Sequence, residues 1–387
     1  MRILFAAHAS HATAFALAPL ARAAKSRGHE VVMAGSEQTV EAITASGLPA
    51  FACTNRPLSE FILYERDGTR VAPARTAEEM VFGAGRWFGR YAATALRSLQ
   101  PLTEYFRPDL VVGGSLSFVA PLLATQLQVP YVRQTWDMYE ITPYLSGVEH
   151  ELEPELVELG LSSLPAPIST LDVAPPSLRP HHDGSPHRAI RFVPSNMQAA
   201  IEPWMIRAQS DRPRVCLTMG SRVQTTDTFD TSFQKLRDLI AGLSRLDVEL
   251  LVAAPPKVAA SVGHLIPLGH AGFIPLDLVA PTCDVLVHHA GGVSTLTALD
   301  AGTPQVMLPD AEIWERTTKK IAALGAGISV APGDGVIERA VQACHTVLGD
   351  SAVSGSADKL RSEIRSMPHP AECVEELEQA VAIGPQP

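Results

Sequence analysis

The sequence lacks the long apolar run of a membrane-spanning helix, because no segment approaches about 18 consecutive apolar residues. It also lacks the positive charge of nucleic-acid-binding proteins: the formal net charge is −10 and the sequence pI is about 5.7. The first residues, Met1 to Ala6, predict a strand rather than a targeting peptide. We therefore expect a cytoplasmic protein that binds neither a membrane nor nucleic acid.

Signatures of several common enzyme classes are missing as well. The five cysteines are scattered and form no C-x-x-C pair, so neither a zinc site nor a disulfide framework is expected. There is no lysine-bearing P-loop and no G-x-G-x-x-G turn. The first loop, Ala7 to Thr13, contains no glycine, which disfavours an NAD-dependent dehydrogenase.

The most informative feature that is present is a histidine followed by small residues, His289-Ala-Gly-Gly-Val-Ser-Thr295. It follows an apolar run over 284–288 and precedes a helical pattern over 296–301. Glycines let backbone N–H groups approach an anion, and a helix N-terminus adds favourable partial charge. The stretch predicts a site for a diphosphate, to which the following residues contribute: His289, Gly291, Gly292, Val293 and Ser294.

Two further loops are predicted to complete this site. Gly220-Ser221-Arg222 follows a strand and offers a hydroxyl, backbone amides and a guanidinium that can bind phosphate through two hydrogen bonds. Such a tripeptide is weak evidence alone, because many of its occurrences are only turns. In the loop over 271–276, Phe273 could stack on a base and the backbone of Ile274 could pair with it. Ordinary core packing is the alternative for Phe273.

Strand and helix patterns alternate along the chain. The first 35 residues read as strand, helix, strand, and the unit recurs over 108–133 and again from Arg214 onward. This alternation predicts an α/β protein with two doubly wound, Rossmann-like domains and ligands in a cleft at the carboxyl ends of both parallel sheets. The expected domains are 1–195 and 196–368. A C-terminal helix and tail, 369–387, is expected to pack back toward the N-terminal domain.

Three segments interrupt the alternation. Residues 174–187 are rich in proline, glycine and histidine and are the best candidate for a linker. Residues 56–75 are polar and resemble a long excursion rather than a crossover. Residues 149–160 have an acidic helical pattern, which we interpret as a solvated amphipathic face.

The chain resembles nucleotide-sugar glycosyltransferases of the two-domain B fold (GT-B, family 1). In the second half the resemblance is carried by Gly272-Phe-Ile-Pro275, 284–299, Ala301-Gly-Thr-Pro-Gln305 and Leu324-Gly-Ala-Gly327. More closely, it looks like the deoxysugar transferases that decorate aromatic polyketide antibiotics. Segments similar to the angucycline group of the urdamycin and landomycin pathways include Arg2-Ile-Leu-Phe5, 15–20, Gly85-Arg-Trp-Phe88, Arg133-Gln-Thr-Trp-Asp137 and Glu202-Pro-Trp204. The resemblance covers essentially the whole chain.

The resemblance implies a function. We expect inverting transfer of a deoxysugar, D-olivose, from a dTDP-sugar to the phenolic oxygen of an angucyclinone, with the N-terminal domain binding the acceptor. Attack by the ortho ring carbon, giving a C-glycoside, is the alternative. The dTDP-sugar is a co-substrate, and no cofactor is expected; no D-x-D motif occurs, so no metal is expected either. A homodimer is possible. The expected acceptor wall consists of Phe61, Tyr64, Met80, Trp87 and Trp136.

The catalytic base departs from the wider family. Many relatives carry a Gly-His pair at the start of the first helix, where this chain has Ala12-Thr13, and threonine cannot accept a proton at neutral pH. The angucycline relatives use an aspartate at the position of Asp137, which therefore is the expected base. A helix cap or a partner for Arg133 is its alternative role. His8 and His11 are the other candidates for the base, and Ser10 is expected to orient sugar or phosphate.

The sugar site departs as well. Many relatives hold sugar hydroxyls with an Asp-Gln pair, and by register these positions are Ile313 and Trp314 here. A carboxylate that faces a carbon without a hydroxyl would be buried and unpaired, so apolar residues suit a deoxysugar. Two other functions stay open at this point: a sugar-nucleotide epimerase of the same fold, and an inactive helper protein.

Overall fold

The computed structural model describes residues 1–179, 186–206, 211–220, 229–309 and 312–383. The chain forms two compact units. The first comprises Met1–Val173, Pro180–Met197 and Met367–Pro387, and the second comprises Ala174–Arg179 and Gln198–Ser366. The expected boundaries after residues 195 and 368 each lie two residues from these crossings. Residues 174–179, expected in the first domain, belong to the second unit.

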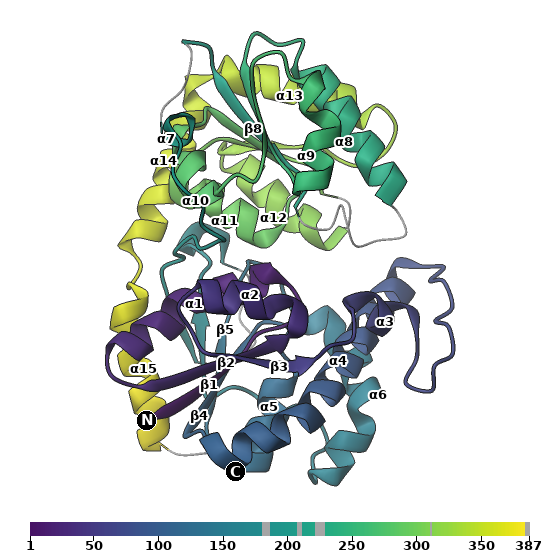
Figure 1. Ribbon diagram of the computed structural model, residues 1–387, viewed down its shortest axis with the longest axis vertical. Coiled ribbons are helices and arrows are strands. Elements are labelled where there is room, and N and C mark those ends of the chain that lie inside the picture. Colours follow the sequence, from purple (N-terminus) through teal and green to yellow (C-terminus); the bar gives the residue numbers. More distant parts are fainter. Residues whose placement is uncertain (180–185, 207–210, 221–228, 310–311, 384–387) are drawn as a thin grey trace. The chain divides into compact units, whose positions relative to one another are not determined.

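The first unit is built on a parallel seven-stranded sheet of order β3-β2-β1-β4-β5-β6-β7 (Figure 1). The order reverses between β1 and β4, which makes the loops that follow these strands the natural place for a ligand. The strands are β1 (Arg2–Ala6), β2 (Glu30–Ser36), β3 (Ala50–Thr54), β4 (Leu110–Gly114), β5 (Tyr131–Gln134), β6 (Ser169–Asp172) and β7 (His187–Ala189).

Helices cover both faces of this sheet. They are α1 (His11–Ser26), α2 (Glu37–Ala45), α3 (Leu58–Leu63), α4 (Ala77–Phe106), α5 (Val119–Leu127), α6 (Thr142–Glu158) and α15 (Pro370–Ile383). The C-terminal helix α15 packs on α1, and Glu378 pairs with Arg27 at 2.9 Å and with His29 at 3.0 Å. The last helix of the chain therefore completes the first unit rather than the second.

The second unit repeats the design with a parallel six-stranded sheet of order β10-β9-β8-β11-β12-β13, reversing between β8 and β11. Its strands are β8 (Arg214–Thr218), β9 (Glu249–Ala253), β10 (Gly269–Gly272), β11 (Val285–His288), β12 (Gln305–Met307) and β13 (Gly327–Ser329). Its helices are α7 (Pro203–Ile206), α8 (Phe229–Leu243), α9 (Pro256–Val262), α10 (Leu276–Val279), α11 (Gly292–Ala301), α12 (Glu312–Ala323), α13 (Val336–Leu348) and α14 (Ser351–Ser366). The predicted class, two doubly wound α/β domains, is confirmed.

The sequence patterns did not predict some of the observed elements. The expected linker over 174–187 contains a short 3₁₀ turn (Pro176–Leu178) and the start of β7, because short edge elements carry little periodicity. The long helix α4 was also missed. In the described part of the chain, no helix is both long and apolar enough to cross a bilayer.

Helices α4 and α6 approach each other closely through glycines. A Cβ atom on Gly85 would overlap with the carbonyl oxygen of Tyr144, and one on Gly147 would overlap with the carbonyl oxygen of Phe82. A Cβ atom on Gly89 would lie 2.7 Å from the Cβ of Glu151. Because no side chain separates the two backbones, polar groups on α6 are buried against α4.

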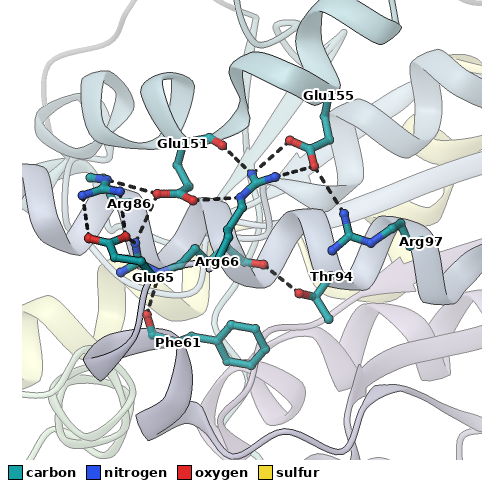
Figure 2. Close-up of polar contacts among 9 residues, drawn as sticks. Phe61, Glu65, Arg66, Arg86, Thr94, Arg97, Glu151 and Glu155 are labelled. Carbon is teal, nitrogen blue, oxygen red and sulfur yellow. Dashed lines mark hydrogen bonds and ion pairs between the residues drawn. The ribbon is translucent and has the colours of Figure 1, made fainter. Parts of the chain in front are cut away.

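Glu151 and Glu155 of α6 belong to an ionic cluster, the α4–α6 cluster, of three glutamates and four arginines (Figure 2). One of the arginines, Arg97, is exposed and pairs with Glu155 at 3.5 Å. Arg66 pairs with Glu151 and Glu155, each at 2.8 Å. Arg86 pairs with Glu65 at 2.7 Å and with Glu151 at 3.0 Å, and Arg90 pairs with the same two glutamates at 2.7 and 3.1 Å. The interpretation of the acidic helix as a solvated face is therefore wrong for Glu151 and Glu155, which are both buried.

The α4–α6 cluster fastens the polar excursion over 56–75 to the body of the first unit. Glu65 and Arg66 belong to this excursion, and Arg90 also donates from Nε to the carbonyl oxygen of Phe61 at 2.9 Å. A β-bridge between Tyr64 and Arg70 closes the excursion on itself. Partly buried charge pairs, together with the buried side chain of Phe61, therefore hold this segment against the first unit.

We predict that Glu151→Gln destabilises the protein by about 3 kcal/mol, because removing one member of a buried charge network leaves the arginines uncompensated. The matched control is Glu153→Gln, which removes the same charge from an exposed position of α6 and should change stability by less than about 0.5 kcal/mol. Urea unfolding monitored by circular dichroism measures both. Equal effects of the two substitutions would contradict the role of the cluster.

Candidate functional site

The loops after β8 and β11 meet at the carboxyl edge of the second sheet. These strands are neighbours, with Thr218 in register with His288. Gly220 has φ +69°, and a Cβ atom there would lie 2.5 Å from Cε1 of His289. A Cβ atom on Gly291 would overlap with Nε2 of the same ring. The His289 imidazole therefore lies between two glycines, and this position explains why both residues lack a side chain.

Helix α11 begins immediately after this histidine. Its N-cap, Gly291, has no side chain to cap the helix, and the first intrahelical bond runs from Thr295 N–H to the Gly291 carbonyl at 2.9 Å. The first N–H groups of a helix have no partner within the helix. The backbones of Gly292, Val293 and Ser294 carry such groups, and these residues are partly exposed. The predicted diphosphate residues of this loop thus gather at one helix N-terminus, where an anion is favoured.

His288 takes part in this arrangement and was missed by the sequence analysis. It is fully buried, its Nε2 lies 2.8 Å from Oε1 of Gln305, and its Nδ1 accepts from Ala290 N–H at 3.1 Å. Burial lowers the pKa of His288 to about 4, and the hydrogen bond to Gln305 opposes this shift. The doubled histidine at 288–289 was the available signal.

The other predicted donor-site residues differ in their exposure to solvent. Phe273 follows β10 and is 44% exposed, whereas Ile274 is buried in the core. Trp314 lies on α12 and is partly buried. Ser221, Arg222 and the side chain of Ile313 lie outside the described residues.

The first loop of the first unit is a structured helix cap. Ser10 is the N-cap of α1, and its Oγ accepts from Thr13 N–H at 3.4 Å. The Thr13 hydroxyl donates to the Ser10 carbonyl at 2.7 Å and accepts from His8 N–H at 3.2 Å. Thr13, which stands where many relatives have a base, therefore stabilises the loop.

The two histidines of this loop have different surroundings. His8 is buried among Trp87, Phe88 and Tyr91, with ring centroids 4.3–5.4 Å apart, and burial lowers its pKa to about 3. Such an imidazole binds a proton weakly at neutral pH. His11 has its Nε2 2.7 Å from the carbonyl oxygen of Gln38.

Asp137 lies in the loop after β5 and is partly buried. Burial raises its pKa to about 7, and the charge of Asp172 adds to the rise, while hydrogen bonds from Tyr139 N–H (3.2 Å) and the Trp136 side chain oppose it. Helix α6 has Ile141 as its N-cap, so Asp137 is no helix cap. A carboxylate with a pKa near neutrality suits a general base.

The predicted acceptor residues separate into two groups. Tyr64 and Met80 are 41% and 61% exposed, and Ile62 and Phe82 are exposed in the same two segments. Trp87 is partly buried, 3.8 Å from Phe88 between ring centroids.

Two of the predicted acceptor residues are core residues instead. Phe61 is 1% exposed and packs on Tyr91, and Trp136 is 5% exposed and packs over Gly114. These two aromatic side chains fill the interior, and this corrects the expectation that they present a face to a ligand.

Comparison with known proteins identifies the family to which this geometry belongs. The family described as Erythromycin biosynthesis protein CIII-like matches with its N-terminal domain over residues 22–220 and with its C-terminal domain over 237–380. The chain is 31% identical over 379 residues to the L-demethylnoviosyl transferase of Streptomyces niveus, and the match covers 97% of both chains.

Solved structures agree with this result. The glycosyltransferase SsfS6 of Streptomyces sp. SF2575, solved with thymidine diphosphate, is 32% identical with a TM-score of 0.83, covering 98% of this chain and 99% of that one. The spinosyn rhamnosyltransferase SpnG, solved with spinosyn aglycone, is 27% identical with a TM-score of 0.82, covering 98% and 100%. The expected GT-B fold is thereby confirmed, and the chain belongs to the erythromycin biosynthesis protein CIII-like family of glycosyltransferases.

Proposed function

We propose that this glycosyltransferase inverts the anomeric carbon while it moves a deoxysugar, D-olivose, from a dTDP-sugar to the phenolic oxygen of an angucyclinone. The observation that carries the proposal is the loop at the N-terminus of α11, where His289 lies between Gly220 and Gly291. The thymidine diphosphate bound by SsfS6 and the aglycone bound by SpnG support a nucleotide donor and a polyketide acceptor. The resemblance to angucycline transferases supports the choice of sugar and acceptor.

The donor half of the reaction breaks the bond between the anomeric carbon and the diphosphate oxygen. Negative charge then builds on the diphosphate while the sugar passes through an oxocarbenium-like state. His289 and the first amides of α11 stabilise this charge, and Ser221 and Arg222 are proposed to add to it. With these donors the reaction proceeds without a metal ion.

The acceptor half needs a base. Asp137 takes the proton of the phenol as its oxygen attacks the anomeric carbon from the face opposite the leaving diphosphate. Ser10 Oγ accepts a hydrogen bond from Thr13 N–H, and the Ser10 hydroxyl can donate a hydrogen bond to the sugar or the phosphate. The exposed side chains of Tyr64 and Met80 supply apolar contact area for a polycyclic ring system.

The sugar specificity rests on Ile313 and Trp314. Apolar side chains at positions where many relatives have an Asp-Gln pair leave no buried carboxylate to satisfy, which favours a sugar that lacks hydroxyl groups. Among deoxysugar donors, the resemblance to the angucycline transferases favours dTDP-D-olivose.

Incubation with dTDP-D-olivose and an angucyclinone, followed by mass spectrometry, tests the function. We expect a product heavier than the acceptor by one deoxyhexose residue, and release of the sugar on mild acid hydrolysis. A product that survives the acid is the C-glycoside and rejects O-transfer. Epimerised donor without acceptor modification rejects the transferase reaction.

His289→Ala should weaken dTDP binding and lower turnover at least about tenfold, because one positioned donor to developing charge contributes on the order of 2.7–4 kcal/mol. Calorimetry and initial rates measure the two effects. His264→Ala, an exposed histidine of the same unit, is the control and should change neither. Unchanged affinity together with unchanged turnover in His289→Ala would reject the site.

Asp137→Asn should lower turnover by about 10²–10⁴-fold and leave dTDP affinity nearly intact, because the amide cannot accept a proton. Wild-type kcat/KM should fall as pH drops below about 7, the pKa of Asp137, and the variant should lack this dependence. The same substitution should increase stability at high pH. Because the pKa of Asp137 is raised in the folded state, the folded wild-type protein loses stability as pH rises from the ordinary pKa of a carboxyl to about 7. The variant has no such group and should therefore be more stable than wild type at pH 8. Wild-type rates in the variant would exclude Asp137 as the base.

A further inference from the structure

The buried His288 hydrogen-bonds with both of its ring nitrogens. It is the last residue of β11, and Gln305 is the first residue of the neighbouring β12. Leu286 is in register with Gln305, so the side chain two residues further along β11 lies on the same face of the sheet. This register brings the imidazole within 2.8 Å of the carboxamide.

These contacts determine the tautomer of His288. A backbone N–H can only donate, so Nδ1 must accept from Ala290 N–H. The neutral ring then carries its hydrogen on Nε2, which donates to Oε1 of Gln305. Rotating the carboxamide by 180° would give Nε2 a donor instead and would force the ring hydrogen onto Nδ1, against the amide of Ala290.

The bond to Ala290 N–H falls at the critical turn of the loop. Ala290 is fully buried and has φ +63°, a left-handed conformation that is uncommon for a residue with a Cβ atom. The next residue is Gly291, the N-cap of α11, and the preceding one is His289. The turn therefore sets both the position of the His289 ring and the direction of the first amides of the helix.

The carboxamide of Gln305 has one unfavourable feature in this arrangement. Among the atoms that the structure describes, its Nε2 is buried and has no hydrogen-bond partner. An unpaired buried amide group is unfavourable. The carboxamide nonetheless presents its oxygen to His288, which is the orientation that the tautomer of His288 requires.

We propose that His288, oriented by Gln305, is a positioning residue that holds the Ala290 turn in its left-handed conformation and so presents His289 and the amides of α11 to the diphosphate of the donor. His288 acts through Ala290 and does not itself touch the ligand. The inference rests on the proposed function, because the diphosphate is the donor proposed there.

Three variants separate the two nitrogens. In His288→Asn the side-chain oxygen reaches the position of Nδ1 and can still accept from Ala290 N–H. In His288→Gln the carboxamide reaches the position of Nε2 and keeps the contact with Gln305 only, while His288→Leu keeps neither contact. Calorimetry with dTDP should give wild-type affinity within about threefold for the Asn variant and about tenfold weaker binding for Gln and Leu, the factor that corresponds to one hydrogen bond.

Val306→Ala is the matched control for general loss of packing, because Val306 is a fully buried residue of β12 outside the loop. It should lower the melting temperature and leave dTDP affinity unchanged. Equal affinities in wild type and in all folded His288 variants would overturn the proposal. So would binding by the Asn variant as weak as that of the Gln variant, or a loss in Val306→Ala as large as that in His288→Leu.

The tautomer gives a second test that needs neither dTDP nor a variant. Nitrogen NMR of the wild-type protein with ¹⁵N-labelled histidine should show His288 as the neutral form with hydrogen on Nε2. A hydrogen on Nδ1, or rapid exchange between the two forms, would overturn the proposal. Failure of wild type to bind dTDP would reject the proposed donor instead, and the tautomer would then decide the role of His288 on its own.

Discussion

A buried imidazole with hydrogen bonds at both nitrogens determines how the backbone leaves β11. The bond from Ala290 N–H to His288 Nδ1 fixes a left-handed turn at a residue that is not glycine. The ring of His289 and the N-terminus of α11 follow from that turn, and the glycines at 220 and 291 provide the space for the ring. Without this turn the second unit would still have its sheet, but the amides of α11 would not converge with His289.

In the first unit, burial shifts the pKa of two side chains, and only one of them becomes suited to exchange a proton near neutral pH. Asp137 is a carboxyl whose pKa is raised to about 7 by desolvation, so that it can exchange a proton near neutral pH. The same environment makes the ionised form of Asp137 unfavourable, so the role proposed for it as a base would lower the stability of the folded protein. His8 shows the other outcome of burial: enclosed by aromatic rings, it has a pKa near 3 and is not suited to act as a base.

The α4–α6 cluster uses partly buried charges to attach a whole segment of the first unit. The excursion over 56–75 contributes Phe61 to the core, and Arg66 fastens it further to Glu151 and Glu155 of α6. These glutamates are buried because α6 approaches α4 closely at Gly85, Gly89 and Gly147. Tyr64 and Met80 are therefore exposed on segments that a buried charge network holds in place. In both units, close approaches near the predicted ligand residues depend on glycines, because a Cβ atom at these positions would overlap with neighbouring atoms.

The sequence by itself determined the fold class, the repeated βα units and the loop at His289, because these depend on local periodicity and on short motifs whose chemistry is contained in adjacent residues. It also placed Asp137 at the end of a strand. Only the tertiary structure decided which polar side chains are dry. The sequence pattern predicts a solvated face for Glu151 and Glu155, but the close approach of α4 and α6 at Gly89 and Gly147 buries both side chains. It likewise predicts ligand contacts for Phe61 and Trp136, which lie in the core. The role of His288 depends on Gln305, a partner 17 residues away on another strand, and no local pattern encodes a contact made by strand register.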